Sequence, residues 1–324
     1  MEIGLGLQSD KAVGEYAHIG RIAEDHGFDV ISVFADLLYQ PPIAALLEIA
    51  QATDRVRLGA ACWNPFTMHP YEIAGQALAL DQASQGRAYI GLARGSWMDT
   101  IRVRQDRPVQ AIEEAIAVIK ALTSGDDRGV DGDIFGLETD TSLRYPRFRD
   151  EMPVLIGTWG PRLAAVAGQV ADEVKIGGTA NPAMVAVMTK RIAAAAGRSV
   201  GIVIGAVTVV DEDAEFARSL ARTEVAMYID VVGRLDPTLD LPPGLLDEIH
   251  SLVQVGDSNA AGQLISDDIL DMFAFAGSPE QVASQAQRLI DAGVQRVEFG
   301  TPHGRTGTSG IELLGSRVLP LLRR

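Results

Sequence analysis

Residues 153–210 read PVLIGTWGPRLAAVAGQVADEVKIGGTANPAMVAVMTKRIAAAAGRSVGIVIGAVTVV. Three short, mainly apolar runs alternate in this stretch with two longer segments, Pro161–Val170 and Ala183–Ala195, that have the length of helices. Runs rich in β-branched residues are typical of strands that are buried on both faces of a parallel sheet. The alternation of strands with helices therefore predicts a parallel α/β fold.

The same alternation extends in both directions along the chain. The strand-like runs are Ile3–Leu7, Val30–Phe34, Arg57–Ala61, Ala88–Leu92, Val154–Ile156, Val174–Ile176, Ile202–Val210 and Val294–Phe299. The other helix-like segments are Lys11–His26, Ile43–Ala52, Tyr71–Ala83, Val109–Leu122, Pro279–Ala292 and Gly310–Leu322. This number of units predicts a (β/α)8 TIM barrel, with residues 1–324 forming a single domain.

Two segments are longer than the repeating unit requires. Residues 126–149 follow the fourth helix, and residues 232–271, with a helix-like piece at Leu245–Val253, follow the seventh strand. Long connections of this kind often form lids or subunit contacts. We expect residues 126–149 to form a mobile lid over the strand ends, with Arg144, Arg147 and Arg149 near the anionic tail of a ligand. The alternative is that these arginines form a solvated surface paired with nearby acids.

The composition excludes several classes of partner. Lys and Arg total 28 and Asp and Glu total 43, so the net charge is −15. Such a chain has no basic field to attract nucleic acid or an anionic membrane. The single cysteine, Cys62, cannot form an internal disulfide, and we see neither a secretory signal nor a run of transmembrane length. We therefore expect a cytoplasmic protein.

Several common catalytic motifs are absent from the sequence. It has no Gly-x-Gly-x-x-Gly after a strand, no phosphate-binding P-loop and no Gly-x-Ser-x-Gly. The five histidines do not cluster with one another or with the cysteine. No dedicated metal site is therefore expected.

In a TIM barrel the active site is built from the residues that follow the strands. All three tryptophans fall there, since Trp63, Trp97 and Trp159 follow the third, fourth and fifth strands. Any one of them could cap the core, but three on one face favour a substrate pocket with aromatic walls. Glycines followed by a helix start occur in three of these loops, and amides at helix N-termini bind phosphate, although ordinary turns are the commoner role of one glycine. The loops together predict a planar, phosphorylated cofactor.

Read in order, these loops resemble the luciferase-like monooxygenase superfamily, and within it the branch that uses the deazaflavin coenzyme F420 and includes the methylenetetrahydromethanopterin reductases. The resemblance covers nearly the whole chain. It is carried by Arg57-Leu58-Gly59, Asn64-Pro65, His69-Pro70, Leu80-Asp81, Ser84-Gln85-Gly86-Arg87, Ile90–Gly95, Pro153–Gly157, Gly160-Pro161, Ala171-Asp172, Asn181-Pro182, Gly277–Glu280 and Gly293-Val294. Each of these passages is common, and their order is what is specific.

The resemblance implies that the cofactor lies across the strand ends. Asp36 and Asn64 would contact the deazaflavin ring and its polyol, and Asp36 and Arg94 are the candidate catalytic residues. The Ala61–Cys62 peptide bond is predicted to be cis and to support the back of the ring, with the Cys62 thiol chemically inert. The remaining cofactor-binding residues would be Ala93, Arg94, Gly95, Gly157, Thr158, Trp159, Gly160, Gly177, Gly178 and Thr179.

The sequence departs from the characterised relatives at their proton-transfer groups. Methylenetetrahydromethanopterin reductases carry a glutamate in the first strand, where this chain has Gly6. Sugar-phosphate dehydrogenases of the same branch have a histidine where this chain has Leu37 and a glutamate where it has Arg94. Neither relative's substrate can therefore be carried over. We expect Arg94 either to stabilise negative charge on a substrate or to form an ion pair with Asp99 or Asp36.

The leading hypothesis is an F420-dependent oxidoreductase, a homodimer by analogy, that transfers a hydride between the deazaflavin coenzyme and a small organic substrate. Two alternatives remain. One is an FMN-dependent monooxygenase on the same barrel, and the other is a non-catalytic barrel that binds a flavin.

Overall fold

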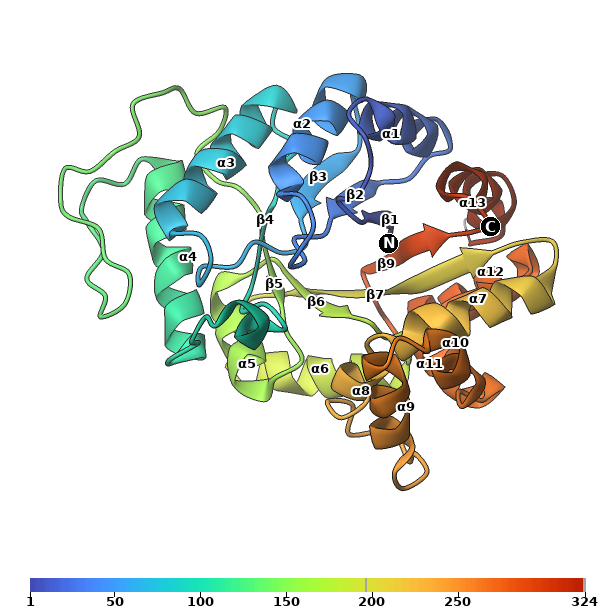
Figure 1. The fold of residues 1–324 in the computed structure, drawn as a ribbon. Coiled ribbons are helices and arrows are strands. Elements are labelled where there is room, and N and C mark those ends of the chain that lie inside the picture. The colour runs from blue at the N-terminus through green and yellow to red at the C-terminus, as the bar shows by residue number, and fades with distance from the viewer. Residues whose placement is uncertain (196, 323–324) are drawn as a thin grey trace.

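The computed structural model describes residues 1–195 and 197–322 and shows a barrel of parallel strands surrounded by helices (Figure 1). The strands are bonded in the order β3-β2-β1-β9-β7-β6-β5-β4. Isolated bridges between Leu58 and Ala88 and between Trp63 and Leu92 join the two ends of this order. The sheet is thereby nearly closed, as a TIM barrel requires.

Eight strands form the wall of the barrel, and each lies at one of the predicted runs. They are β1 (Glu2–Leu7), β2 (Val30–Val33), β3 (Arg57–Ala60), β4 (Ile90–Ala93), β5 (Val154–Gly157), β6 (Glu173–Gly177), β7 (Gly201–Val210) and β9 (Arg296–His303). All named pairs run parallel. The predicted (β/α)8 barrel is confirmed.

Helices cover the outside of the barrel and bury its main apolar core against the strands. They are α1 (Glu15–Asp25), α2 (Pro42–Ala52), α3 (Pro70–Ala83), α4 (Pro108–Ser124), α5 (Pro161–Val170), α6 (Ala183–Ala193), α12 (Pro279–Asp291) and α13 (Gly307–Leu313), which continues through η2 (Leu314–Val318) into α14 (Leu319–Leu322). Proline in the first turn sets the start of α2, α3, α4, α5 and α12, because its fixed φ suits that position and its missing N–H is not needed there. Within the described ranges, no helix combines the length and the apolar character needed to cross a bilayer.

The segment between β7 and α12 builds a second, smaller apolar core. It comprises α7 (Ala214–Ala226), α8 (Ile229–Val232), α9 (Leu245–Gln254), α10 (Ser258–Gln263), α11 (Asp267–Phe273) and β8 (Ala274–Gly277). β8 pairs with β7 from Val207 onward, just beyond the point where β6 stops pairing with it. The predicted piece at Leu245–Val253 is confirmed as α9. The sequence analysis missed α7, although Asp213 caps it by accepting a 3.1 Å hydrogen bond from the Phe216 amide.

Residues 126–149 lie outside α4, away from the centre of the barrel (Figure 1). Glu114 on α4 accepts hydrogen bonds from the backbone amides of Ile134 at 2.7 Å and Phe135 at 2.9 Å. At the end of the segment, Arg149 donates to Asp81 on α3 at 2.8 Å. These contacts hold the segment against the outer helices, so the predicted lid over the strand ends is wrong. Arg149 is committed to a buried carboxylate, and it is therefore not available to a ligand at the strand ends.

Candidate active site

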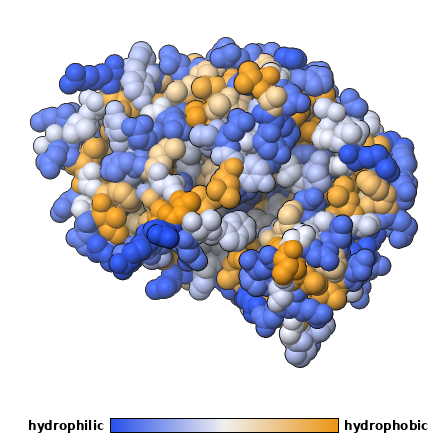
Figure 2. Space-filling view, viewed as in Figure 1, coloured by the Kyte–Doolittle hydropathy of each residue, from blue (hydrophilic) through white to orange (hydrophobic). Residues whose placement is uncertain are grey.

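The carboxyl ends of β3, β4, β5 and β6 carry only small side chains. The Ala61–Cys62 peptide bond after β3 is cis, as predicted. A Cβ on Gly157 would lie 3.1 Å from Cys62 Sγ and 3.2 Å from Ala93 Cβ, whereas one on Gly177 would have nothing within 4 Å. The strand ends therefore form a closely packed floor with open space above Gly177. In Figure 2 the surface is hollowed near the middle of the view, between the segment that carries η1 (Met98–Ile101) and helices α8 and α9.

Asp36 follows β2 at the edge of this floor. The residue is exposed to solvent. The part of its carboxyl that protein shields from water raises the pKa of Asp36 above its ordinary value, although the Gln8 amide and the Lys175 charge act in the opposite direction. A carboxyl in that state can hold a proton closer to neutral pH than a free aspartate, which suits a general acid.

Arg94 follows β4 and is exposed. Among the residues that the structure describes, its guanidinium forms no ion pair with Asp99, Asp36 or any other acid. The alternative in which Arg94 only orders its loop through an ion pair is therefore not realised here. Its planar fork is free to bind an anionic group two-pronged.

Asn64, in contrast, is buried and bonded to the protein at both ends of its amide. Its oxygen accepts from the Phe66 amide at 2.9 Å, and its nitrogen donates to the sulfur of Met98 at 3.2 Å. Gly95 has a φ of +79°, and a Cβ there would lie 2.1 Å from Asn64 Nδ2. Asn64 and Gly95 thus join the loops after β3 and β4. Both the side-chain oxygen and the side-chain nitrogen of Asn64 already have a hydrogen-bond partner within the protein.

The three tryptophans differ in exposure. Trp97, directly before η1, is 49% exposed, and Trp159 is partly buried with its Nε1 donating to the Gly177 carbonyl at 3.1 Å. Trp63 is 1% exposed and belongs to the apolar core. The prediction that all three tryptophans line one open pocket is therefore wrong for Trp63, which is buried in the core.

In the glycine-rich loops after β5 and β6, some backbone amides are already hydrogen-bonded to other parts of the protein. The amides of Thr158 and Gly178 donate to the carbonyls of Lys175 at 3.0 Å and Gly205 at 2.7 Å. Thr179 is buried, and its hydroxyl donates to the Met272 carbonyl. After β5, however, α5 begins at Pro161, and its N-cap Gly160 offers no side-chain cap, so amides of its first turn are open to an anionic group. The small residues, the open space above Gly177 and this helix start fit a planar ligand with a phosphate.

Two further titratable groups at the strand ends stay neutral near pH 7. Burial raises the pKa of the Cys62 thiol to about 12, which supports its predicted inertness. Burial also lowers the pKa of His303 to about 4, helped by the charge of Lys11. The neutral ring of His303 donates through Nε2 toward the carbonyls of Gly6 and Phe299.

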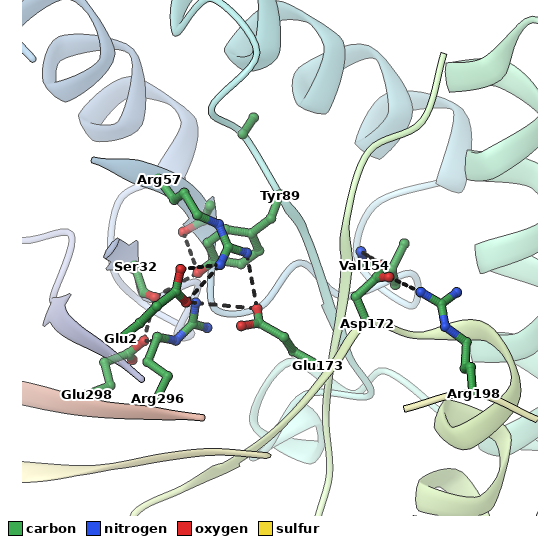
Figure 3. Close-up of polar contacts among 12 residues, drawn as sticks. Glu2, Ser32, Arg57, Tyr89, Val154, Asp172, Glu173, Arg198, Arg296 and Glu298 are labelled. Atoms are coloured by element: carbon green, nitrogen blue, oxygen red, sulfur yellow. Dashed lines mark hydrogen bonds and ion pairs between the residues drawn. The ribbon is translucent and has the colours of Figure 1, made fainter. Parts of the chain in front are cut away.

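Below this floor the inside of the barrel is charged, which the sequence analysis missed. Figure 3 shows the side chains of Glu2, Arg57, Glu173 and Arg296 pointing toward one another from β1, β3, β6 and β9. Arg57 lies 2.8 Å from Glu2 and 3.3 Å from Glu173, and Arg296 lies 3.3 Å from Glu173. Arg296 has no exposed surface, and its guanidinium lies 5.4 Å from the centre of the Tyr89 ring.

The next layer toward the strand ends contains Lys175 and Glu298. Lys175 Nζ donates to Glu298 Oε1, while Ser32 donates to the other oxygen at 2.6 Å. Ser32 is in turn bonded to the Tyr89 hydroxyl at 2.7 Å. We call the six residues Glu2, Arg57, Glu173, Lys175, Arg296 and Glu298 the barrel network. It contains as many acids as bases, so its formal charge is zero.

Comparison with known proteins agrees with this geometry. Residues 1–296 match the family described as luciferase-like monooxygenase. The chain is 27% identical to the 5,10-methylenetetrahydromethanopterin reductase of Methanolobus tindarius, over 98% of this chain and 100% of that protein. It is 24% identical to the F420-dependent glucose-6-phosphate dehydrogenase of Microbacterium testaceum, over 96% and 94%.

A solved structure gives the same result at the level of the fold. The coenzyme F420 dependent tetrahydromethanopterin reductase from Methanopyrus kandleri superposes with a TM-score of 0.86 at 25% identity, and the match covers 98% of each chain. Fold, strand-end geometry and family match coincide over nearly the full length of the sequence. The chain belongs to the luciferase-like monooxygenase family.

Proposed function

We propose that this chain is an F420-dependent oxidoreductase that transfers a hydride between the deazaflavin coenzyme and a small organic substrate in the hollow at the strand ends. The observation that carries the proposal is the floor of small residues at Cys62, Ala93, Gly157 and Gly177, with Trp97 exposed directly before η1. Relatives named as F420-dependent enzymes match over nearly the full chain and support the choice of cofactor.

The residues present fit this coenzyme. Ala93 to Gly95, Gly157 to Gly160 and Gly177 to Thr179 would hold the polyol and phosphate parts, with the first turn of α5 facing the phosphate. When bound, the deazaflavin supplies or accepts the hydride, and the protein supplies orientation and charge. Trp97 and Trp159 would form the wall that the substrate contacts.

Asp36 and Arg94 have different roles in this proposal. Asp36 would hold the proton that is delivered to the substrate, because its surroundings favour the protonated carboxyl. Arg94 cannot act as an acid near neutral pH, but it can stabilise negative charge that develops on the substrate. A carbonyl, imine or conjugated alkene would be a suitable class of acceptor, since each develops negative charge as hydride arrives.

We also propose that the enzyme is a cytoplasmic homodimer without nucleic-acid or membrane partners. The net charge of −15 and the single cysteine support this setting. Size-exclusion chromatography with light scattering tests the subunit number, and a monomer at micromolar concentration would contradict the dimer.

Titration with F420 and with FMN, followed by tryptophan fluorescence, tests the cofactor. We expect F420 to bind much more tightly and to quench Trp97 and Trp159 more than the buried Trp63, with Trp97→Phe reducing the quenched fraction. FMN binding of equal strength, with oxygen consumption in the presence of reduced FMN, would assign the chain to the monooxygenases. Binding without any hydride transfer to a panel of carbonyls, imines and alkenes would instead favour the non-catalytic barrel.

A further inference from the structure

The loop between β6 and α6 joins the candidate site to the smaller apolar core. β6 ends at Gly177, on the floor of the site, and the loop follows it. A Cβ on Gly178 would lie 3.1 Å from Cε2 of Tyr228 and 3.3 Å from Cγ1 of Val232. Both of these side chains pack against the smaller core, at the start and the end of α8. An apolar contact on a glycine has no preferred direction, so it does not by itself fix the position of α8.

A buried polar contact supplies the missing direction. The side-chain nitrogen of Asn181 donates to Asp236 Oδ2 at 2.8 Å and to the Thr238 hydroxyl at 2.8 Å. The other oxygen of Asp236 accepts from the Thr238 amide at 2.8 Å and from the Thr238 hydroxyl at 2.6 Å. Asn181 and Asp236 are only 4% and 6% exposed. We call Asn181, Asp236 and Thr238 the clamp, and it joins the loop after β6 to the segment between α8 and α9.

The clamp allows only one arrangement of its side chains. Asn181 Oδ1 accepts from the Ala183 amide at 3.0 Å, so the oxygen and the nitrogen of this side chain both have partners. If the Asn181 amide turned over, its oxygen would face an Asp236 oxygen and its nitrogen would face the Ala183 N–H. Buried polar groups are costly when they lose their partners. The clamp therefore holds the segment after α8 at one position on the loop after β6.

The other end of this loop is bonded to a tryptophan of the candidate site. Trp159 Nε1 donates to the Gly177 carbonyl at 3.1 Å, and Asn181 is the fourth residue after Gly177. Between them, the Gly178 amide donates to the Gly205 carbonyl at 2.7 Å. The loop is thus short and bonded along its length. A displacement at Asn181 should shift it as a unit and should change the contact between Gly177 and Trp159.

We propose that Asn181 and Asp236 are positioning residues of the candidate site. They act through Gly177 and Gly178, by holding α8 and the loop after β6 against each other. When the clamp is intact, the Gly177 carbonyl stays where it fixes the Trp159 ring. When the clamp is broken, α8 separates from Gly178 and the bond to Trp159 weakens. The consequence for the coenzyme rests on the proposed function, in which this loop holds part of it.

Exchanging the two buried side chains of the clamp tests the proposal. Asn181→Asp keeps the oxygen that accepts from the Ala183 amide, but it places two carboxyl groups face to face. Asp236→Asn places two amide nitrogens face to face. The double variant Asn181→Asp/Asp236→Asn again sets a donor against an acceptor, in the opposite sense. The single variants should therefore disturb the site, and the double variant should restore it.

The readout is the indole N–H signal of Trp159 in the full-length chain without cofactor. Labelling tryptophan with 15N gives one such NMR signal for each of the three tryptophans, and Trp159→Phe identifies the signal of this residue. Asn181→Asp should shift the Trp159 signal and accelerate its hydrogen exchange roughly tenfold, because the bond to Gly177 weakens. Asp236→Asn should act in the same direction. The signal of the buried Trp63 should stay as in wild type.

Thr238→Val disturbs the clamp more gently and decides the question if the buried variants do not fold. Thr238 is exposed, so the loss of its hydroxyl should leave the fold intact. The substitution removes one acceptor from Asn181 and one donor from Asp236. We expect a smaller change of the Trp159 signal in the same direction as with Asn181→Asp.

Asp257→Ala is the matched control within the smaller core. It removes the N-cap of α10, where Asp257 accepts from the Ala260 amide at 3.0 Å, and it should lower stability without changing the Trp159 signal. An unchanged Trp159 signal in folded Asn181→Asp and in Thr238→Val would overturn the proposal. An equal change in Asp257→Ala, or a folded double variant that behaves like the single variants, would overturn it as well.

Titration with F420 separates this proposal from the proposed function. The Kd of F420 should rise roughly threefold to tenfold in Asn181→Asp and return toward the wild-type value in the double variant. If F420 fails to bind the wild-type chain, the proposed function fails, while the Trp159 signal still decides the role of the clamp. If F420 binds and reacts but the Trp159 signal is the same in all clamp variants, only the clamp is refuted.

Discussion

The side-chain amide of Asn64 donates to the sulfur of Met98 at 3.2 Å, and this contact joins the loop after β3 to η1 after β4. Gly95 lies directly against it, because its φ of +79° and its missing Cβ allow Asn64 Nδ2 to approach to 2.1 Å from the position that a Cβ would take. The two loops that border the floor of the site therefore depend on one another.

Gly95→Ala should separate these loops. The left-handed φ alone costs about 1–3 kcal/mol for a residue with a Cβ, and the clash with Asn64 adds to it. We expect lower stability in urea and cofactor affinity reduced at least severalfold. Gly307→Ala is the matched control, because a Cβ there meets nothing within 4 Å. Equal cofactor affinities in the two variants would contradict the coupling of the loops.

Arg94 should affect turnover more than binding. Arg94→Lys should keep the fold and the cofactor affinity but lower kcat, because a point charge cannot reproduce two-pronged contact. Arg94→Gln should lose roughly tenfold to a hundredfold in kcat, since a charge-assisted hydrogen bond contributes about 1.5–3 kcal/mol. Arg104→Gln in the same loop is the control, and it removes only an exposed contact with Asp106. Wild-type kcat in both Arg94 variants would show that Arg94 has no role in the reaction.

Arg149 should matter for stability and not for the ligand. Asp81 has no exposed surface, and Arg149 bonds it through Nη2 at 2.8 Å and Nε at 3.2 Å. Arg149→Met leaves a buried carboxylate unpaired, which costs about 3–5 kcal/mol by urea denaturation. Arg144→Ala should change stability by less than about 0.5 kcal/mol. A loss of cofactor affinity in folded Arg149→Met, with a weaker dependence on salt, would restore the lid interpretation.

Glu114 should make the attachment of residues 126–149 sensitive to acid. Although burial raises the pKa of Glu114, hydrogen bonds from the amides of Phe135 and Ile134 lower it to about 2. Because the pKa is lower in the folded state, the carboxylate stabilises the fold above its ordinary pKa of about 4.5, and this contribution is lost as pH falls from there toward 2. Hydrogen exchange of this segment should accelerate over that range in wild type and vary less with pH in Glu114→Gln. Glu113→Gln, at the exposed neighbouring position, should behave as wild type.

The barrel and the strand-end floor were predictable because they depend on local patterns. Except for β7, each strand run is followed by a helix start marked by proline or glycine. The loops after β3 to β6 carry most of the residues that the family resemblance identifies. The position of residues 126–149 was not predictable in this way, because it depends on the distant partners Glu114 and Asp81. Helix α7 was not predicted because its segment lacks a continuous apolar run, and its only local signal is Asp213 at the N-cap position.

The barrel network had a sequence signal that was overlooked. Glu173 and Lys175 alternate with apolar residues in β6, and Arg296 and Glu298 do the same in β9. Alternate residues of a strand point to the same face, so each pair had to point either into the barrel or toward the helices. Charged side chains are tolerated inside the barrel only if opposite charges meet there. The pairing depends on closure of the barrel, which brings distant strands together, and on the space left by the glycines at positions 4, 6 and 205.

The zero net charge of the barrel network also constrains how this sequence can evolve. Replacing Arg296 alone would remove a cation from Glu173 and Glu298, which are only 8% and 1% exposed, so the first step away from the present set is strongly disfavoured. An apolar interior is nevertheless a sound alternative for a barrel. Substitutions at Glu173, Lys175, Arg296 and Glu298 should therefore be tolerated together more readily than one at a time.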